Sequence, residues 1–351
     1  MEEIFLERRL IMKKFFTGKS ILITGGVGSI GSHLLKQLLT FEPKVIRVLD
    51  NNEYKLFELS QKHNQIIRPL LGDIRDFSRL KKATEHVDIV FHAAALKHVE
   101  LSEFNPFEVV KTNVLGTQNI LQAALESNVE KLILISTDKA ANPINTMGAT
   151  KLLAEKLTVS ASYHKGTSRT KFAAVRFGNV LGSNGSAAPL WLDQIEKNQE
   201  ITITDSNMTR FVMSPHHAID LILRATIQAE GGEVFILKMP SVRVIDLAKA
   251  LIALYQSSFP GKNTDIGIKE IGIKIGEKIH EELVVQQEVD HLFETDGMYV
   301  LQPHAELLGL KMIHQQQKLK KVPSDFNYSS ETNNYLDQEA IIKLLKESSI
   351  L

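Results

Sequence analysis

The sequence predicts an α/β fold in which helices cover both faces of a parallel sheet, followed by a smaller α/β lobe. Two observations support this fold class. Short apolar segments rich in isoleucine, valine and leucine alternate with helical patterns through about residue 165, as in a doubly wound sheet. In addition, Gly25, Gly28 and Gly31 follow the first apolar segment and open a helix, which is typical of a Rossmann-like dinucleotide-binding turn.

The composition excludes several classes of protein and partner. The 351 residues carry 41 basic and 41 acidic side chains, so the charge predicts neither nucleic acid nor an anionic membrane as partner. No apolar run approaches the roughly 20 residues of a membrane-spanning helix, and the first residues lack a signal-peptide core. The chain has no cysteine, and its twelve histidines show no metal-ligand spacing, so we expect no metal site. A soluble cytoplasmic protein is the simplest interpretation.

We expect four parts along the chain. Residues 1–18 read as an amphipathic lead-in helix for packing or subunit contact, and residues 19–178 as the dinucleotide-binding domain. Residues 179–312 form mainly a smaller lobe over the strand ends, because the strand–helix alternation becomes looser there, and some segments return to the first domain. Residues 313–351 form a polar tail and a final helix.

The glycine turn begins at the end of the first strand, Lys19 to Thr24. One glycine allows the tight turn, one lets the backbone approach a pyrophosphate, and one allows close packing of helix on strand. The helix that starts at Ser29 and Ile30 would present free N–H groups to the same anion. The motif alone also fits a plain turn, but here the strand, the helix and a following acidic residue occur in order.

That acidic residue is Asp50, which ends the strand Val45 to Leu49. A carboxylate at this position can accept hydrogen bonds from the adenosine ribose and repels a 2′-phosphate, so we expect NAD rather than NADP. Arg47 and Lys55 lie near enough in sequence to leave NADP open. At the end of the third strand, Asp73 could reach the adenine edge or cap the next helix.

The fourth strand, Asp88 to Phe91, runs into small residues that let a dinucleotide lie close to the strand end. Lys97 follows them, and its ammonium could meet a phosphate or remain a surface lysine. A helix predicted over 105–127 carries Asn113 at its middle, where it is either exposed or turned toward the fifth strand to fix the backbone there. We expect further cofactor contacts at Ile74, Ala93 and Ala94.

The stretch from Leu132 to Lys151 is the most informative part of the chain. A short buried strand, Leu132 to Ile135, ends in Ser136, Thr137, Asp138 and Lys139. Ligands of open α/β sheets bind outside the carboxyl ends of the strands, so these side chains are candidates for chemistry. Met147 and Lys151 are four residues apart on the following helix and share one face. The alternative is a polar loop followed by an amphipathic surface helix.

Taken together, these motifs resemble the extended short-chain dehydrogenase/reductase family. Within it the chain is most similar, over roughly residues 18–300, to the nucleotide-sugar 4,6-dehydratases of polysaccharide and flagellin glycosylation, which act on UDP-N-acetylglucosamine. The motifs that carry the resemblance are Ala94-Ala95-Leu96-Lys97-His98-Val99, Ser136-Thr137-Asp138-Lys139-Ala140, Asn142-Pro143, Gly148-Ala149-Thr150-Lys151, Arg176-Phe177-Gly178-Asn179-Val180, Met208-Thr209-Arg210-Phe211 and Gly276-Glu277-Lys278.

One position departs from the wider family, which has a tyrosine four residues before the lysine that matches Lys151. That tyrosine removes the proton of the sugar 4-hydroxyl, but the chain has Met147 there, and a thioether is a poor proton acceptor. Some members of the resembled subfamily also carry methionine at this position. The base for the oxidation therefore stays open between Thr137, Asp138, directly or through water, and a water held by the substrate.

The resemblance implies a closed redox cycle on the sugar. Bound NAD takes a hydride from C4, water leaves across C5 and C6, and the hydride returns to C6. It implies Asp138 as the acid at C6, Lys139 as the base at C5, and Lys151 as the residue that holds the nicotinamide ribose. For Lys139 to act as a base, we expect burial and the nearby charges of Lys151 and the nicotinamide to lower its pKa. The alternative for Lys139 is a surface ion pair with Asp138.

The resemblance also implies contacts with the UDP-sugar in the second lobe. The matched substrate-binding positions are Asn179, Arg210, Lys274 and Glu277, with Lys97 contributed by the first domain. Arg210 can bind a diphosphate with both arms of its guanidinium. Lys274 stands where the family often has arginine, so a single charge replaces a two-pronged contact. Members of the family usually associate through helices beside the sheet, so a homo-oligomer is expected.

Two other functions compete with the dehydratase. One is a nucleotide-sugar C4 epimerase, which does not need the Asp138–Lys139 pair. The other is a dinucleotide-binding regulatory protein without catalysis, as the missing tyrosine suggests; against it, Asp138, Lys139 and Lys151 are all present. Whether C5 is returned with retention or inversion does not follow from the spacing of the motifs.

Overall fold

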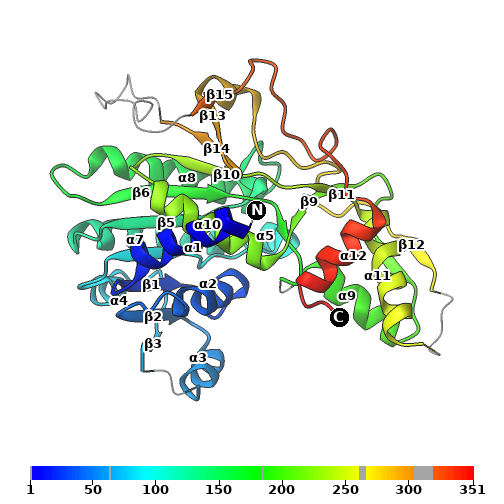
Figure 1. Ribbon diagram of the computed structural model, residues 1–351, viewed down its shortest axis with the longest axis horizontal. Helices are drawn as coiled ribbons and strands as arrows, with labels where there is room; N and C mark the ends of the chain where they lie inside the picture. Colours follow the sequence, from blue (N-terminus) through cyan, green and yellow to red (C-terminus); the bar gives the residue numbers. More distant parts are fainter. Residues whose placement is uncertain (1, 63–64, 184, 261–265, 304–318) are drawn as a thin grey trace.

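The computed structural model describes residues 2–62, 65–183, 185–260, 266–303 and 319–351. A ten-stranded sheet lies at the centre of the first domain, in the order β15-β13-β14-β10-β6-β5-β4-β1-β2-β3 (Figure 1). Every neighbouring pair from β3 to β10 is parallel, and β14, β13 and β15 extend the sheet with antiparallel pairing. The strands are β1 Ser20–Thr24, β2 Val45–Asp50, β3 Ile67–Leu71, β4 Ile89–His92, β5 Lys131–Ile135, β6 Lys171–Arg176, β10 Val234–Leu237, β13 Leu292–Thr295, β14 Met298–Leu301 and β15 Lys320–Lys321.

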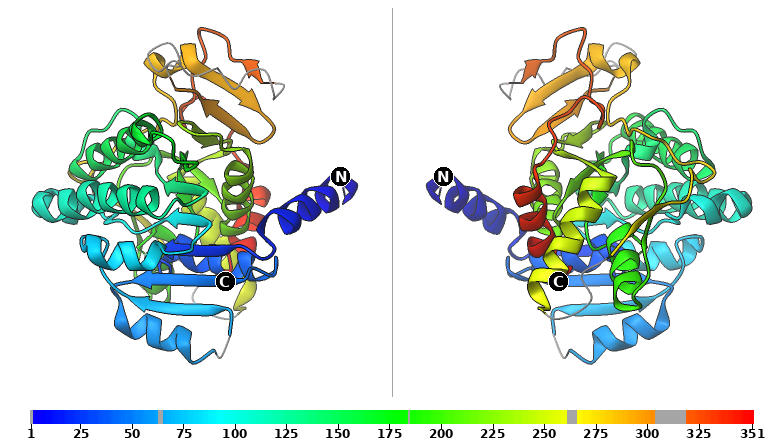
Figure 2. Two further views of the ribbon diagram at one scale, coloured as in Figure 1. Left: turned by 90° about the vertical axis from the view of Figure 1, so that its left-hand side faces the viewer. Right: turned by 90° about the vertical axis from the view of Figure 1, so that its right-hand side faces the viewer.

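Helices cover both faces of this sheet, which confirms the predicted doubly wound fold (Figure 2). Side chains alternate between the faces along each strand. Ile21 and Ile23 of β1 join a core with Leu34 of α2, whereas Leu22 joins the opposite core with Leu80 of α4 and Ile120 of α7. The helices of this domain are α1 Glu2–Phe16, α2 Ser29–Leu39, α3 Glu53–Ser60, α4 Phe77–Thr84, α5 Val99–Phe104, α6 Pro106–Val109, α7 Gly116–Glu126, α8 Thr146–His164 and α10 Pro215–Gln228.

The chain leaves the first domain after β6 and returns to it. Helix α10 packs beside α2, and β10 pairs with β6, so part of the second half of the chain completes the sheet. The excursions between these segments build the smaller lobe.

The helix predicted over 105–127 is interrupted. A π-helical turn, Val110–Leu115, separates α6 from α7, and Asn113 lies in this turn with an exposed fraction of 1%. The Asn113 amide oxygen accepts from the Leu96 N–H, and its nitrogen donates to the Leu96 carbonyl and to the Thr150 hydroxyl. The buried alternative for Asn113 is therefore the one found, but the amide fixes the backbone after β4 rather than the fifth strand.

The smaller lobe has its own apolar core around Trp191, Leu251, Ile341 and Leu345. Its elements are β7 Asn179–Val180, α9 Ala187–Glu196, β8 Ile201–Ile203, β9 Thr209–Met213, β11 Ser241–Arg243, α11 Val244–Ser258, β12 Ile268–Glu270 and α12 Gln338–Glu347. The final helix α12 packs on α11, so the end of the chain belongs to this lobe. The division of the chain into four parts stays a prediction.

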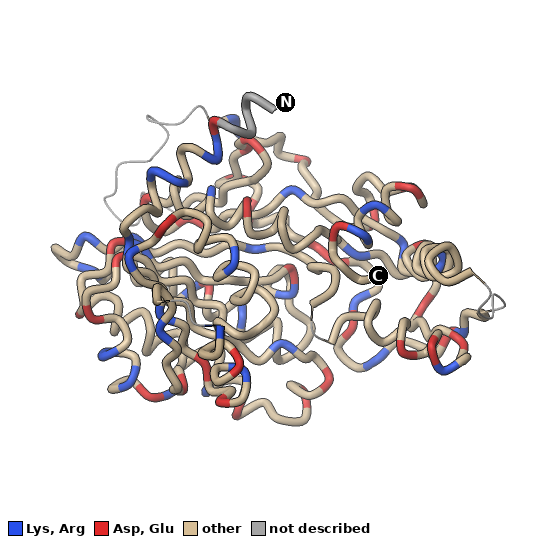
Figure 3. The backbone as a smooth tube through the Cα atoms, turned by 60° about the horizontal axis from the view of Figure 1, so that its bottom comes forward, with Lys and Arg blue, Asp and Glu red and all other residues tan. Residues whose placement is uncertain are grey.

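The N-terminal helix α1 projects from the side of the molecule (Figure 2). Met12 and Phe16 anchor it in the core, where the Phe16 ring stacks on Phe41 at 5.9 Å, while Leu10 and Ile11 are exposed. None of the described helices is long and apolar enough to cross a bilayer. Basic and acidic residues are interspersed along the described chain, consistent with the balanced charge (Figure 3).

Apolar side chains are also exposed along α5, α6 and the π-helical turn. Phe104 and Phe107 have exposed fractions of 74% and 80%, and Val110 and Leu115 continue the same stretch. These elements pack against α8. The homo-oligomer stays a prediction.

Candidate active site

A cavity of about 1430 Å³ lies between the carboxyl ends of the parallel strands and the smaller lobe. It brings together most of the residues predicted from the sequence. From the predicted set its lining contains Gly25, Gly28, Ser29, Ile30, Gly31, Ala93, Lys97, Thr137, Asp138, Lys139, Lys151, Asn179, Arg210, Lys274 and Glu277. Four predicted cofactor residues, Asp50, Asp73, Ile74 and Ala94, lie outside this lining.

The glycine turn leaves no room for side chains. Gly25 has a φ of +65°, and a Cβ atom there would lie 2.7 Å from the Ala94 backbone. A Cβ atom on Gly31 would lie 2.6 Å from the Gly26 Cα atom, so the first turn of α2 packs directly on the loop. The start of α2, Ser29 to Gly31, lines the cavity, and the N-terminus of a helix favours an anion such as a pyrophosphate. The turn therefore fits the dinucleotide that the sequence predicts.

Asp50 lies at the end of β2 beside the glycine turn. Its carboxylate accepts from the Val27 N–H at 3.2 Å and from the Asn52 N–H at 3.0 Å. Arg47, by contrast, donates to the carbonyls of Ala83 and Glu85 at the end of α4, so its guanidinium is held by α4 and does not supply a charge for a 2′-phosphate. These contacts favour NAD over NADP.

Asp73 and Ile74, two more of the predicted cofactor contacts, are held by other parts of the protein. Asp73 accepts two hydrogen bonds from the Arg75 guanidinium, and these lower the pKa of its carboxyl. The cap of α4 comes from Asp76 instead, so the capping alternative for Asp73 is wrong. Ile74 is buried against Gly116 in the core. Contacts of Asp73 and Ile74 with a cofactor stay predictions.

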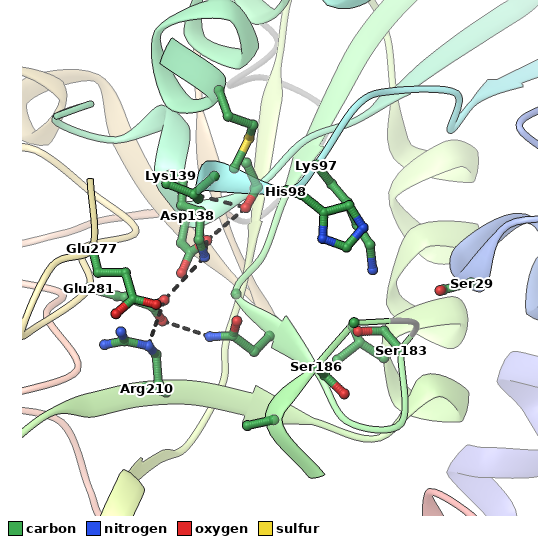
Figure 4. A pocket seen from close by; sticks show the side chains of 18 of the residues that line it. Ser29, Lys97, His98, Asp138, Lys139, Ser183, Ser186, Arg210, Glu277 and Glu281 are labelled. Carbon is green, nitrogen blue, oxygen red and sulfur yellow. Dashed lines mark hydrogen bonds and ion pairs between the residues drawn. The ribbon is translucent and has the colours of Figure 1, made fainter. Parts of the chain in front are cut away.

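The reactive groups follow β5 in a single turn of 3₁₀ helix, Asp138–Ala140. The Asp138 N–H donates to the Phe177 carbonyl at the end of β6, which fixes this turn. The Thr137 hydroxyl donates to Asp138 Oδ1 at 2.7 Å, and Lys139 Nζ lies 3.1 Å from the same oxygen (Figure 4). Asp138 Oδ2 is buried without a hydrogen-bond partner, and Asp138 has an exposed fraction of 1%. An unpaired carboxylate oxygen in the cavity can accept a proton from a ligand.

The charge state of Lys139 differs from the sequence prediction. Burial alone would lower its pKa, but Asp138 and Glu281 lie 3.1 and 3.2 Å from Nζ and together raise the pKa above its ordinary value. The predicted lowering by Lys151 is therefore wrong for the free protein. Burial likewise opposes ionisation of Asp138, but the Lys139 ammonium and the Thr137 hydroxyl hold its pKa below the usual range. In this state Lys139 is an ammonium and Asp138 a carboxylate.

Met147 and Lys151 lie on the inner face of α8 and both line the cavity. Met147 has an exposed fraction of 3%, and its thioether stands where the wider family has an acid–base group. Lys151 Nζ donates to the Ile135 carbonyl at 2.6 Å. Burial lowers the pKa of Lys151 to about 8, although Glu155, one turn further along α8, acts in the opposite direction.

We expect Lys151→Met to stabilise the cofactor-free protein at pH 7 while it removes activity. A lysine pKa of about 8 in place of 10.5 means that keeping the ammonium in the folded protein costs about 3 kcal/mol. The variant avoids this cost but loses the hydrogen bond to the Ile135 carbonyl, so its net gain in stability is smaller. The unfolded chain binds more protons between pH 8 and 10.5, so the wild-type stability rises across that window and the advantage of the variant disappears. Urea unfolding at pH 7 and pH 10 measures the difference, with the exposed Lys156→Met as control. A less stable variant at pH 7 would contradict this account.

The smaller lobe supplies the residues expected to bind substrate. Arg210 donates to the carbonyls of Thr209 and Ile279, and its Nε lies 3.3 Å from Glu281 Oε1, so its guanidinium is partly engaged within the protein. Asn179 donates to Glu281 at 2.8 Å. Glu277 Oε2 is buried in the cavity wall without a hydrogen-bond partner and can accept from a ligand hydroxyl.

Sequence reasoning missed Glu281. Its carboxylate is buried, lines the cavity and contacts Lys139, Arg210 and Asn179 (Figure 4). The neighbouring Glu282 is half-buried and pairs with Lys278 instead. Nothing in the local sequence distinguishes these two adjacent glutamates, and only the fold shows which of them faces the reactive groups.

Comparison with known proteins agrees with this geometry. A family model described as polysaccharide biosynthesis protein matches residues 21–303. A Methanocaldococcus jannaschii protein, described as an uncharacterized membrane protein, is 51% identical over 97% of this chain and 99% of its own length. A UDP-N-acetylglucosamine 4,6-dehydratase (inverting) of Campylobacter jejuni is 39% identical over 91% of this chain and 94% of its own. A UDP-glucose 4-epimerase of Rickettsia felis is 37% identical over 94% and 96%.

Among solved structures, Pen from Bacillus thuringiensis superimposes with a TM-score of 0.86 at 42% identity, covering 95% of this chain and 98% of that one. These similarities extend over both the sheet and the smaller lobe. They agree with the motifs at the glycine turn and after β5, which carried the resemblance. The chain belongs to the polysaccharide biosynthesis protein family, among the nucleotide-sugar dehydratases and epimerases of the short-chain dehydrogenase/reductase type.

Proposed function

We propose that this protein is a nucleotide-sugar 4,6-dehydratase that converts UDP-N-acetylglucosamine to a UDP-4-keto-6-deoxy-N-acetylhexosamine. The observation that carries this proposal is the cluster of Thr137, Asp138 and Lys139 at the end of β5, in the same cavity as the glycine turn and Lys151. The Campylobacter relative with the corresponding name supports the choice of substrate.

NAD fits the first domain and would supply a hydride acceptor that later returns the hydride to the sugar. The glycine turn and the start of α2 would hold its pyrophosphate, and Asp50 its adenosine ribose. Lys151 would hold the nicotinamide ribose from the floor of the cavity, where its ammonium already donates to the Ile135 carbonyl.

Thr137 and Asp138 can replace the missing tyrosine in the oxidation. The Thr137 hydroxyl, which donates to Asp138 at 2.7 Å, would accept the proton of the sugar 4-hydroxyl as it passes its own proton to the carboxylate. Asp138 would then be a neutral acid. In the elimination it would give this proton to the departing 6-hydroxyl, while Lys139 removes the proton from C5. The proton of O4 thus leaves with O6 as water, and Asp138 returns to its starting state.

The C4 epimerase remains the second candidate because the Rickettsia relative carries that name. Epimerisation needs oxidation and reduction at C4 only, so it does not need an acid at C6 or a base at C5, which are the proposed roles of Asp138 and Lys139. The ion pair between the buried Asp138 and the half-buried Lys139 therefore favours the dehydratase.

The proposal is tested by proton NMR in D₂O on the purified protein with UDP-N-acetylglucosamine and no added reductant. A new C6 methyl signal with deuterium at C5 is expected, and its ring couplings report the configuration at C5. Formation of the C4 epimer without a methyl signal would select the second candidate. An unchanged sugar, despite bound NAD and a panel of other nucleotide sugars, would leave a binding protein without catalysis.

A further inference from the structure

Glu281 is the most heavily engaged carboxylate in the cavity. It has an exposed fraction of 4%, and it accepts from donors on three separate elements. Lys139 Nζ and Arg210 Nε lie 3.2 and 3.3 Å from Oε1, while the Asn179 amide at 2.8 Å and the Phe211 N–H at 3.3 Å bind Oε2. The carboxylate of Glu281 therefore links the turn that follows β5 with strands β7 and β9 of the smaller lobe.

The backbone of Glu281 is fixed as well. Its N–H donates to the Ser330 hydroxyl at 2.8 Å, and its carbonyl accepts from the Ser330 N–H at 2.8 Å. The nearby Arg176 donates to the Leu283 carbonyl and to both oxygens of Glu288, which holds the following segment. Glu281 is thus placed against Lys139 by its own backbone and not only by the ion pair.

The proposed reaction requires that the ammonium of Lys139 lose a proton before Lys139 can act at C5. The groups in contact with Glu281 or Lys139 are Asp138 on the same turn, Arg210 and the Phe211 N–H on β9, and the Asn179 amide on β7. The Lys97 ammonium also lines the cavity and interacts electrostatically with Lys139. Arg210, the amide and the N–H cannot accept a proton. Asp138 holds the proton that comes from O4. Of the two described carboxylates that contact Lys139 Nζ directly, Glu281 is therefore the one still able to accept a proton.

We propose that Glu281 is a positioning residue that holds the Lys139 proton while Lys139 acts as the base at C5, an inference that rests on the proposed dehydratase function. The proton moves from Lys139 Nζ to Glu281 Oε1, and the freed lone pair of Nζ takes the proton from C5. The electrons of the C5–H bond form the C5–C6 double bond as the C6–O bond breaks, and the departing oxygen takes the proton of Asp138. When Lys139 gives a proton back to C5, it recovers its own proton from Glu281, so that Lys139 is again an ammonium and Glu281 a carboxylate.

The charges around the pair favour this order of events. Asp138 is the carboxylate that does most to raise the pKa of Lys139, so protonation of Asp138 in the oxidation step weakens the hold on the ammonium. Burial, together with the adjacent Asp138 carboxylate, raises the pKa of Glu281 to about 7. His280 reaches this region only through Thr209, which also bonds Ser330. Glu281 must be ionised to take the proton, so turnover rises as the pH increases through about 7.

The test compares Glu281→Gln and Glu281→Asp with Glu282→Gln, because the adjacent glutamate pairs with Lys278 and Asn142 and is not part of the cavity lining. For Glu281→Gln we expect kcat to fall by a factor of about 100 or more, with KM changed less than about threefold, and the rise in rate near pH 7 to disappear. Reduced cofactor should accumulate on the enzyme, because the oxidation at C4 does not use Glu281. Glu281→Asp should retain the rise with pH at a lower kcat, and Glu282→Gln should behave as wild type.

The failure of this inference differs from the failure of the proposed function. Wild-type protein that forms no C6 methyl sugar rejects the dehydratase, and this inference with it. Wild-type protein that forms the sugar, together with a Glu281→Gln variant that retains kcat within about threefold and the same pH profile, overturns the role of Glu281 alone. If Glu281→Gln does not fold, Glu281→Asp decides: an unchanged kcat and pH profile overturns the inference, and a reduced kcat with reduced cofactor on the enzyme supports it.

Discussion

Lys139→Met is expected to stop the reaction after the oxidation at C4. Methionine has nearly the length of lysine but no amine, so nothing at this position can remove the proton from C5. Asp138 loses the ammonium that lowers the pKa of its carboxyl, and it remains able to accept the O4 proton through Thr137. We expect turnover to fall by about three orders of magnitude, while substrate still reduces the bound cofactor.

Absorbance of the reduced nicotinamide and proton NMR of the sugar measure the two halves of this prediction separately. The variant should show reduced cofactor in stoichiometric amount, with no C6 methyl signal and no deuterium at C5. Lys156→Met, on the exposed face of α8, controls for the loss of a positive charge. A Lys139→Met enzyme that still exchanges the C5 proton would assign the base to another group.

The parts of the site that are local in sequence could be predicted from it. The glycine turn lies between a strand and a helix, and Thr137, Asp138 and Lys139 follow one strand directly, so period and spacing were sufficient to place them. The sheet through β6 was predicted for the same reason. Its antiparallel extension β14, β13 and β15 was not, because short strands near the end of the chain carry no local signal that pairs them with β10.

The electrostatics of the site could not be predicted, because they depend on contacts between distant segments. Lys139 and Glu281 are separated by 142 positions, yet their side chains lie 3.2 Å apart. The lowered pKa predicted for Lys139 rested on burial, Lys151 and the nicotinamide, whereas the fold places its ammonium between the carboxylates of Asp138 and Glu281, which raise the pKa. The π-helical turn at Asn113 has the same origin: tertiary hydrogen bonds to Leu96 override a plain helical pattern.

Asp138→Asn is expected to block the reaction one step earlier than Lys139→Met. Asparagine retains the shape of the side chain, but it cannot take a proton from the Thr137 hydroxyl. The 4-hydroxyl of the sugar then cannot lose its proton, and transfer of the hydride from C4 stops with it. We expect turnover to fall by about three orders of magnitude or more, and the cofactor bound to the variant should stay oxidised in the presence of substrate.

The contrast between the two variants separates the roles of two side chains whose charged atoms lie only 3.1 Å apart. A purely structural ion pair would give the same defect when either member is removed, since each variant breaks the same contact. Thr137→Val is the matched control for the proton path: it removes the hydroxyl and retains the carboxylate, and it should also leave the cofactor oxidised. If Asp138→Asn accumulates reduced cofactor as Lys139→Met does, Asp138 acts only at C6, and the proton of O4 must leave through a water or through the substrate itself.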